Sequence, residues 1–126
     1  MRPDERDEMS GAVIRAAIQV HRTLGPGLLE SVYECCLAHE LRKGGIPFAL
    51  GVRVPVIYDG VKLDQLFRLD LVVADRLVVE LKSVQELHPI HTAQVLTYLR
   101  LTGHRNALLL NFNVSRLVEG IRRISL

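Results

Sequence analysis

Aromatic residues are scarce in this sequence. It has no tryptophan and only three phenylalanines and three tyrosines, which together make up 5% of its 126 residues. This scarcity argues against a platform of aromatic side chains that stacks the bases of a single strand. No apolar run approaches the roughly 20 residues that cross a bilayer, and the start MRPDERDEMS lacks the basic and then apolar character of a secretory signal. We therefore expect no membrane partner.

An excess of one charge is also missing. Lys and Arg number 16 against 14 Asp and Glu, so the net charge is +2, whereas nucleic-acid-binding domains usually carry a clustered basic excess. Thirteen of the basic residues are Arg, which suits phosphate contacts but is also common on ordinary surfaces. The two cysteines, Cys35 and Cys36, are adjacent, so a bridge between them would be strained. Free thiols in a cytoplasmic protein are expected.

What the chain does have is the composition of a globular domain. Hydrophobic residues make up 48% of it, and its length suits one domain over residues 1–126, with 1–8 expected to be a flexible N-terminus. Apolar spacing and Gly or Pro breaks predict an α/β domain in the order helix, helix, three strands, helix, strand and a final edge strand. The predicted helices are 9–24, 28–43 and 89–102, and the predicted strands are 46–58, 62–73, 77–83, 107–112 and 119–126.

Two of these strands form a predicted hairpin around Asp59-Gly60. Pro55 places the first of them at a sheet edge or a bulge, because proline cannot donate to a ladder. A period of two puts Phe67, Leu69, Leu71 and Val73 on one face of the second strand, and Arg68, Asp70 and Val72 on the other.

Charged residues inside two of the most apolar strands indicate a candidate catalytic or metal-binding site. Asp70 lies between two leucines, and Glu80 and Lys82 follow the run Leu77-Val78-Val79. Period two places Glu80 and Lys82 on one face, and a hairpin partner can bring Asp70 beside them. Two carboxylates at one edge of a sheet suit Mg²⁺ or Mn²⁺, and a nearby Lys can orient a water or neutralise a phosphate. The alternative is a buried Asp–Lys or Glu–Lys pair, or the solvated face of an edge strand.

The register of these strands follows from parity. A two-residue turn at Asp75-Arg76 would set Asp70 opposite Leu81, which points away from Glu80 and Lys82. A three-residue loop over 74–76, in which one residue has a positive φ, sets Asp70 opposite Glu80. We therefore predict an odd-numbered loop or a bulge, with Asp70, Glu80 and Lys82 on one face.

The sequence resembles the GxxExxY protein family, which is placed in the PD-(D/E)XK nuclease superfamily. The matching segments are Gly27-Leu28-Leu29-Glu30-Ser31-Val32-Tyr33, His21-Arg22, Leu24-Gly25-Pro26-Gly27, Asn111-Phe112-Asn113 and Gly120-Ile121. The resemblance covers nearly the whole chain after the first ten residues. It implies a restriction-endonuclease-like core, a small mixed β-sheet flanked by helices. Asp70 would be the first acid and Glu80-Leu81-Lys82 the (D/E)-x-K, while Leu69 stands where the superfamily usually has proline.

The resemblance also implies further site residues. Gln94 and Tyr98 form a Q-x-x-x-Y pair that borders the metal site in related nucleases, and His91 joins their helical face. The alternative for this pair is a helix surface packed on the sheet edge. Glu30 resembles a helical Glu that supplements the metal ligands, although an acid in a first turn is also favoured by the helix dipole. His21 could hydrogen-bond Glu30 or be structural.

Two functional hypotheses follow. In the first, the chain is a Mg²⁺- or Mn²⁺-dependent nuclease that cleaves DNA in preference to RNA, with the ion held by Asp70, Glu80 and the Leu81 carbonyl. Lys82 would position the attacking water. In the second, it is a catalytically silent module of the same fold that binds nucleic acid or a protein partner. The chain has no room for an added DNA-reading domain, so a partner, a homodimer or the structure of the substrate would supply specificity.

Overall fold

The computed structural model describes residues 3–126, except for the side chains of 3–7 and 64–66. A five-stranded mixed sheet has the order β1-β2-β3-β4-β5, in which only β3 and β4 are parallel. The elements are α1 (Pro3–Leu24), α2 (Glu30–Lys43), β1 (Phe48–Tyr58), β2 (Val61–Val73), β3 (Leu77–Lys82), α3 (Pro89–Thr102), β4 (Asn106–Asn111), the 3-10 helix η1 (Leu117–Gly120) and β5 (Ile121–Ser125). This confirms the predicted element order and the mixed sheet flanked by helices.

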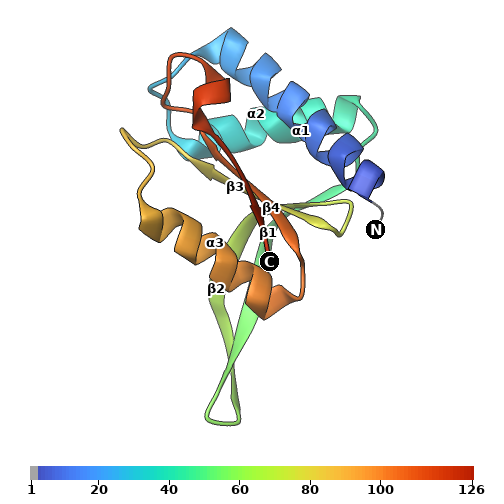
Figure 1. Cartoon of the computed structure of the whole chain (residues 1–126), viewed down its shortest axis with the longest axis vertical. Helices are drawn as coiled ribbons and strands as arrows, with labels where there is room; N and C mark the ends of the chain where they lie inside the picture. The colour runs from blue at the N-terminus through green and yellow to red at the C-terminus, as the bar shows by residue number, and fades with distance from the viewer. Residues whose placement is uncertain (1–2) are drawn as a thin grey trace.

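Helices cover both faces of the sheet. Helices α1 and α2 lie together on one face and α3 lies on the other, while the β1–β2 hairpin extends beyond the layers (Figure 1). Every residue of β4 is buried, as predicted for a strand covered on both faces. Among the described residues, none of the helices combines the length and the apolar character that a membrane crossing requires. Both cysteines carry free thiols, as predicted.

Boundaries differ from the prediction at helix ends. Helix α1 already begins at Pro3, which suits a first helical turn, so residues 3–8 are helical where a flexible segment was expected; 1 and 2 lie outside the described residues. Helix α2 begins at Glu30 rather than Leu28, because the residues before it are held in a loop. Pro55 lies in an edge strand whose register shifts between Val54 and Val56, which confirms the edge and bulge prediction.

The turn between β2 and β3 has the predicted length. Val73 pairs with Leu77, so three residues form the loop and the two numbers of each pair have an even sum. Ala74 and Asp75 both have positive φ, 51° and 55°, and the Arg76 N–H donates to the Val73 carbonyl at 3.0 Å. Two consecutive positive φ angles are typical of a type I′ hairpin turn, here extended by one residue. The prediction of a single positive φ was therefore too small by one.

The loop between α1 and α2 is fixed by Tyr33. Its hydroxyl donates to the Gly25 carbonyl at 2.6 Å and accepts the Leu28 N–H at 3.1 Å, and its ring stacks on Phe112 with centroids 4.4 Å apart. The Tyr33 side chain is fully buried. One hydroxyl thus satisfies two backbone groups of the loop that precedes Glu30.

Replacing Tyr33 with Phe removes this hydroxyl and keeps the stacked ring. We expect Tyr33→Phe to lower the free energy of unfolding by about 1–3 kcal/mol, because two partly buried backbone groups lose their partner. Chemical denaturation checks this, with Tyr58→Phe as a control, since Tyr58 is 71% exposed. Equal stability of the two variants would contradict the role of the Tyr33 hydroxyl.

Candidate functional site

Strands β2 and β3 separate where the predicted acids lie. Their backbone pairing runs from Val73 and Leu77 to Leu71 and Val79, and at the next position side chains replace the ladder. The Glu80 carboxyl oxygen Oε1 accepts the Asp70 N–H at 3.0 Å, and Asp70 Oδ2 accepts the Leu81 N–H at 2.9 Å. Each acid therefore occupies the backbone groups of the opposite strand. We call this arrangement the Asp70–Glu80 fork.

The side chains of β2 change from one face of the sheet to the other at the fork. Leu69 packs in the core beneath α3, whereas Leu71 packs beneath α1 and α2, although a period of two would put both on one side. The prediction that Phe67, Leu69, Leu71 and Val73 share a face is therefore wrong. The reason is that the strand leaves β3 at Asp70 and no longer follows the alternation of a flat ladder.

This break also changes the predicted common face of the site. Glu80 and Lys82 alternate with Val79 and Leu81, which pack beneath α1 and α2, so they are directed to the α3 side. Asp70 instead lines a cleft together with Glu34 of α2, so it is directed towards α2. The even register is confirmed, but the site spans the fork rather than lying on one face.

Burial and the neighbouring acid Asp70 determine the pKa of Glu80. It is only 5% exposed, and its desolvation, together with the charge of Asp70, raises its pKa to about 8. A side-chain hydrogen bond to Asp70 raises this pKa further, while Lys82 lowers it. These effects favour the protonated form of Glu80 in the apo protein at neutral pH. Two ionised carboxylates in the fork would need a cation.

The Leu81 backbone points into the same gap. Because the N–H and C=O of one strand residue point to the same side, the Leu81 carbonyl follows its N–H towards β2. On the other side of the strand, the Lys82 carbonyl accepts the Phe112 N–H at 2.9 Å, which keeps β3 joined to β4. The fork thus gathers hard oxygen donors from Asp70, Glu80 and Leu81.

A cleft of about 470 Å³ opens onto Asp70 from the α2 side. It is lined by Leu28, Leu29, Glu30, Ser31, Glu34, Arg68, Asp70 and Ser83. Arg68 lies between two acids of the cleft: one guanidinium nitrogen is 3.5 Å from Glu34 Oε1 and the other 3.7 Å from Asp70 Oδ1. Burial, followed by the charge of Asp70, raises the pKa of Glu34, and Arg68 opposes this.

Glu34 and Arg68 were missed by the sequence analysis. Each had a periodic signal, since Glu34 lies one helical turn after Glu30 and Arg68 lies two strand residues before Asp70. Glu30 is exposed at the start of α2 and lines the cleft, as expected for an acid near the site.

Helix α3 brings two of its three predicted residues near the fork. The Tyr98 ring packs edge-to-face on Phe67, and burial together with the charges of Glu80 and Asp70 raises its pKa. Burial, followed by the charge of Lys82, lowers the pKa of His91, whose Nδ1 accepts the His88 N–H at 3.0 Å. Gln94 is exposed on α3, one turn before Tyr98.

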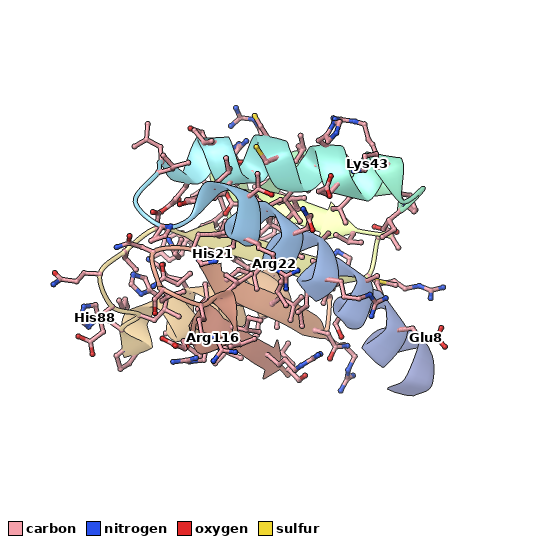
Figure 2. All side chains as sticks on the ribbon, turned by 90° about the horizontal axis from the view of Figure 1, so that it is seen from above. Glu8, His21, Arg22, Lys43, His88 and Arg116 are labelled. Carbon is pink, nitrogen blue, oxygen red and sulfur yellow. The ribbon has the colours of Figure 1, made fainter. Side chains whose placement is uncertain are left out.

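His21 has a structural position. It lies near the C-terminal end of α1 (Figure 2), is 6% exposed, and its Nε2 lies 2.8 Å from the Val114 carbonyl oxygen. The structure thus gives it a backbone partner in place of Glu30. Asn111 supports the same end of the sheet, because its side chain bonds both backbone groups of Val84 at 3.1 and 2.9 Å.

The proton on Glu80 makes apo stability depend on pH. An acid whose pKa is higher in the folded than in the unfolded state stabilises the fold least when both states are ionised. We expect the free energy of unfolding to fall as pH rises from about 4.5 to about 8, by at most about 1.4 kcal/mol per pH unit. Glu80→Gln, which mimics the protonated acid, removes this slope.

Urea denaturation between pH 4.5 and 9 in a chelator measures this effect. The exposed Glu86→Gln is the control and should keep the wild-type slope. If wild type and Glu80→Gln show the same pH dependence, Glu80 does not hold a proton in the folded apo protein.

Comparison with known families identifies the fold. The family model of the PD-(D/E)XK nuclease superfamily matches residues 7–124, which include β1 to β4, all of β5 except its last residue, and the whole fork. Comparisons with curated proteins and with solved structures give no match. Nucleases of this superfamily generally use divalent metals, and their fold suggests a nucleic acid as ligand. The chain belongs to the PD-(D/E)XK nuclease superfamily.

Proposed function

We propose that this protein is a divalent-metal-dependent nuclease that hydrolyses phosphodiester bonds, and that DNA is its substrate in preference to RNA. The observation that carries the proposal is the fork, where the Asp70 and Glu80 carboxyls and the Leu81 backbone meet beside Lys82. The scarcity of aromatic residues disfavours the base stacking by which single-stranded RNA is usually recognised.

The donor set of the fork fits Mg²⁺ or Mn²⁺. Within the described part of the chain, no three or more His, Cys, Asp or Glu side chains form a cluster that could hold a metal alone. Two carboxylates and a carbonyl form a partial shell, which suits Mg²⁺ because this ion keeps several waters and uses substrate phosphates as ligands. A bound ion would stabilise negative charge on the phosphate and lower the pKa of a water.

Residues of the chain would position the ion, the attacking water and the substrate. Asp70 and Glu80 would hold the cation in place of the proton on Glu80, and the Leu81 N–H would keep Asp70 in position. The Lys82 ammonium lies within electrostatic reach of Glu80 and His91, where it orients a water or offsets the charge of a phosphate. Burial and the charge of Lys82 lower the pKa of His91, and because its Nδ1 accepts the His88 N–H, the proton of the neutral ring is on Nε2, which can donate a hydrogen bond to the substrate.

The motif at residues 27–33 supports a narrower assignment. We infer that the chain is a member of the GxxExxY family, in which Glu30 would be a supplementary metal ligand and Gln94 and Tyr98 substrate contacts. Tyr33 gives the motif a physical basis, because its hydroxyl fixes the loop that sets the start of α2. Free thiols at Cys35 and Cys36 favour the cytoplasm, and a protein partner or a second copy would add specificity.

Lys82→Ala separates metal binding from cleavage. We expect the variant to bind Mn²⁺ with nearly wild-type affinity and to lose cleavage by about 100-fold or more, since the ammonium acts on water and phosphate. Calorimetry gives the affinity, and linear, nicked and branched DNA and RNA give the rates. Lys62→Ala, on the exposed hairpin, serves as the matched control.

Asp70→Asn and Glu80→Gln test the metal ligands. Each variant should lose divalent-metal binding while the apo fold remains intact, because the amide oxygen still accepts the backbone N–H that the carboxylate accepts.

Retained cleavage in Lys82→Ala would remove Lys82 from the mechanism. Failure of the wild type to bind millimolar metal would favour the catalytically silent module.

A further inference from the structure

We infer that Arg68 is a phosphate-binding residue, which holds a substrate phosphate in the cleft between α2 and β2; this inference rests on the proposed nuclease function. Arg68 is outside the Asp-and-(D/E)-x-K set, yet it lies two residues before Asp70 and lines the same cleft. It would place the substrate strand next to the fork.

The ion pairs of Arg68 leave it available to a ligand. Its contacts with Glu34 and Asp70 are long, 3.5 and 3.7 Å, and its side chain is 50% exposed, whereas the two acids are 16% and 18% exposed. A guanidinium has five N–H donors in a planar fork that matches phosphate oxygens. The acids therefore orient Arg68 while donors remain on its exposed side.

Gly51 leaves space for the guanidinium of Arg68. It lies on β1 beside β2, with a φ of +58°, and a Cβ at this position would lie 2.9 Å from both Nε and Nη2 of Arg68. The guanidinium therefore lies against bare backbone, and any larger residue would displace it.

The chemistry of the cleft favours a phosphate over another anion. Glu30, Glu34 and Asp70 repel an anion that approaches Arg68 alone, so a ligand must gain a second favourable contact at the fork. A nucleic-acid strand meets this requirement, because one of its phosphates could contact a cation held at the fork while a neighbouring phosphate reaches Arg68. The Arg68 ligand is either an internal phosphodiester or a terminal phosphate.

Binding of a short DNA duplex labelled at its 3′ end, measured by fluorescence anisotropy in Ca²⁺, tests the inference. We expect Arg68→Ala to weaken binding about tenfold, as for loss of a charged hydrogen bond. The slope of log Kd against log salt should fall by about one. Arg68→Lys keeps the charge and loses the planar guanidinium, so its DNA affinity should lie between those of the wild type and Arg68→Ala.

Gly51→Ala provides a test that changes no charge. Its methyl group should displace the guanidinium and weaken DNA binding as Arg68→Ala does. Gly60→Ala is the matched control, because Gly60 has a φ of +72° at the hairpin tip and its added Cβ would meet nothing within 4 Å. Both glycine variants carry similar backbone strain, and only one contacts Arg68.

The outcomes separate this inference from the proposed function. Equal loss of affinity for 5′-phosphorylated duplex, 5′-hydroxyl duplex and closed circular DNA, the last used as an unlabelled competitor, assigns Arg68 to an internal phosphodiester. Loss on the 5′-phosphorylated end alone assigns it to a terminal phosphate. Wild-type DNA affinity in both Arg68→Ala and Gly51→Ala would overturn the inference, as would a wild type that binds no nucleic acid. A wild type that binds DNA through Arg68 but cleaves nothing would overturn only the nuclease function.

Discussion

The Asp70–Glu80 fork is the constraint on which the rest of the site depends. Two carboxyl groups accept backbone N–H groups across the gap between β2 and β3, at 3.0 and 2.9 Å, at the point where the ladder would otherwise continue. Burying two acids together costs free energy unless a proton or a cation is shared between them. In the apo protein a proton on Glu80 meets this cost. The bonds that hold the two carboxyls in this gap therefore also maintain the fold, and the proposed metal site depends on them.

The surrounding layers hold the fork in place from both faces. On one side, Tyr33 and Ser83 fix the loop before α2, the latter through a 2.6 Å bond to the Leu28 carbonyl. On the other side, Tyr98 packs on Phe67 and places α3 against β2. Helices α2 and α3 thus bring Glu30 and His91 to the same end of β3. The helices do more than cover the sheet, because they determine which side chains reach the fork.

Much of this arrangement is predictable from sequence because it depends on periodicity and turn length. The three-residue loop over 74–76 follows from parity once Asp70 is assumed to lie opposite Glu80, and the resemblance to the superfamily supplies the roles proposed for these two acids. The change of facing at Asp70 is not predictable in this way, because local period assumes a regular ladder and the fork ends that ladder. Glu34 and Arg68 were not predicted as site residues. Their only signal is spacing, one helical turn from Glu30 and two strand residues from Asp70, and this spacing indicates a common site only when α2 is known to lie beside β2. The partner of His21 is likewise tertiary, a carbonyl far along the chain.

The most direct test of the account is a crystal structure of the wild-type protein soaked with Mn²⁺, in which anomalous scattering locates the ion. The account predicts one peak in the fork, with oxygen ligands from Asp70, Glu80 and the Leu81 carbonyl, and with the proton between the two carboxyls displaced. A fully occupied Mn²⁺ elsewhere, or carboxyls still bonded to each other at saturating Mn²⁺, would contradict it.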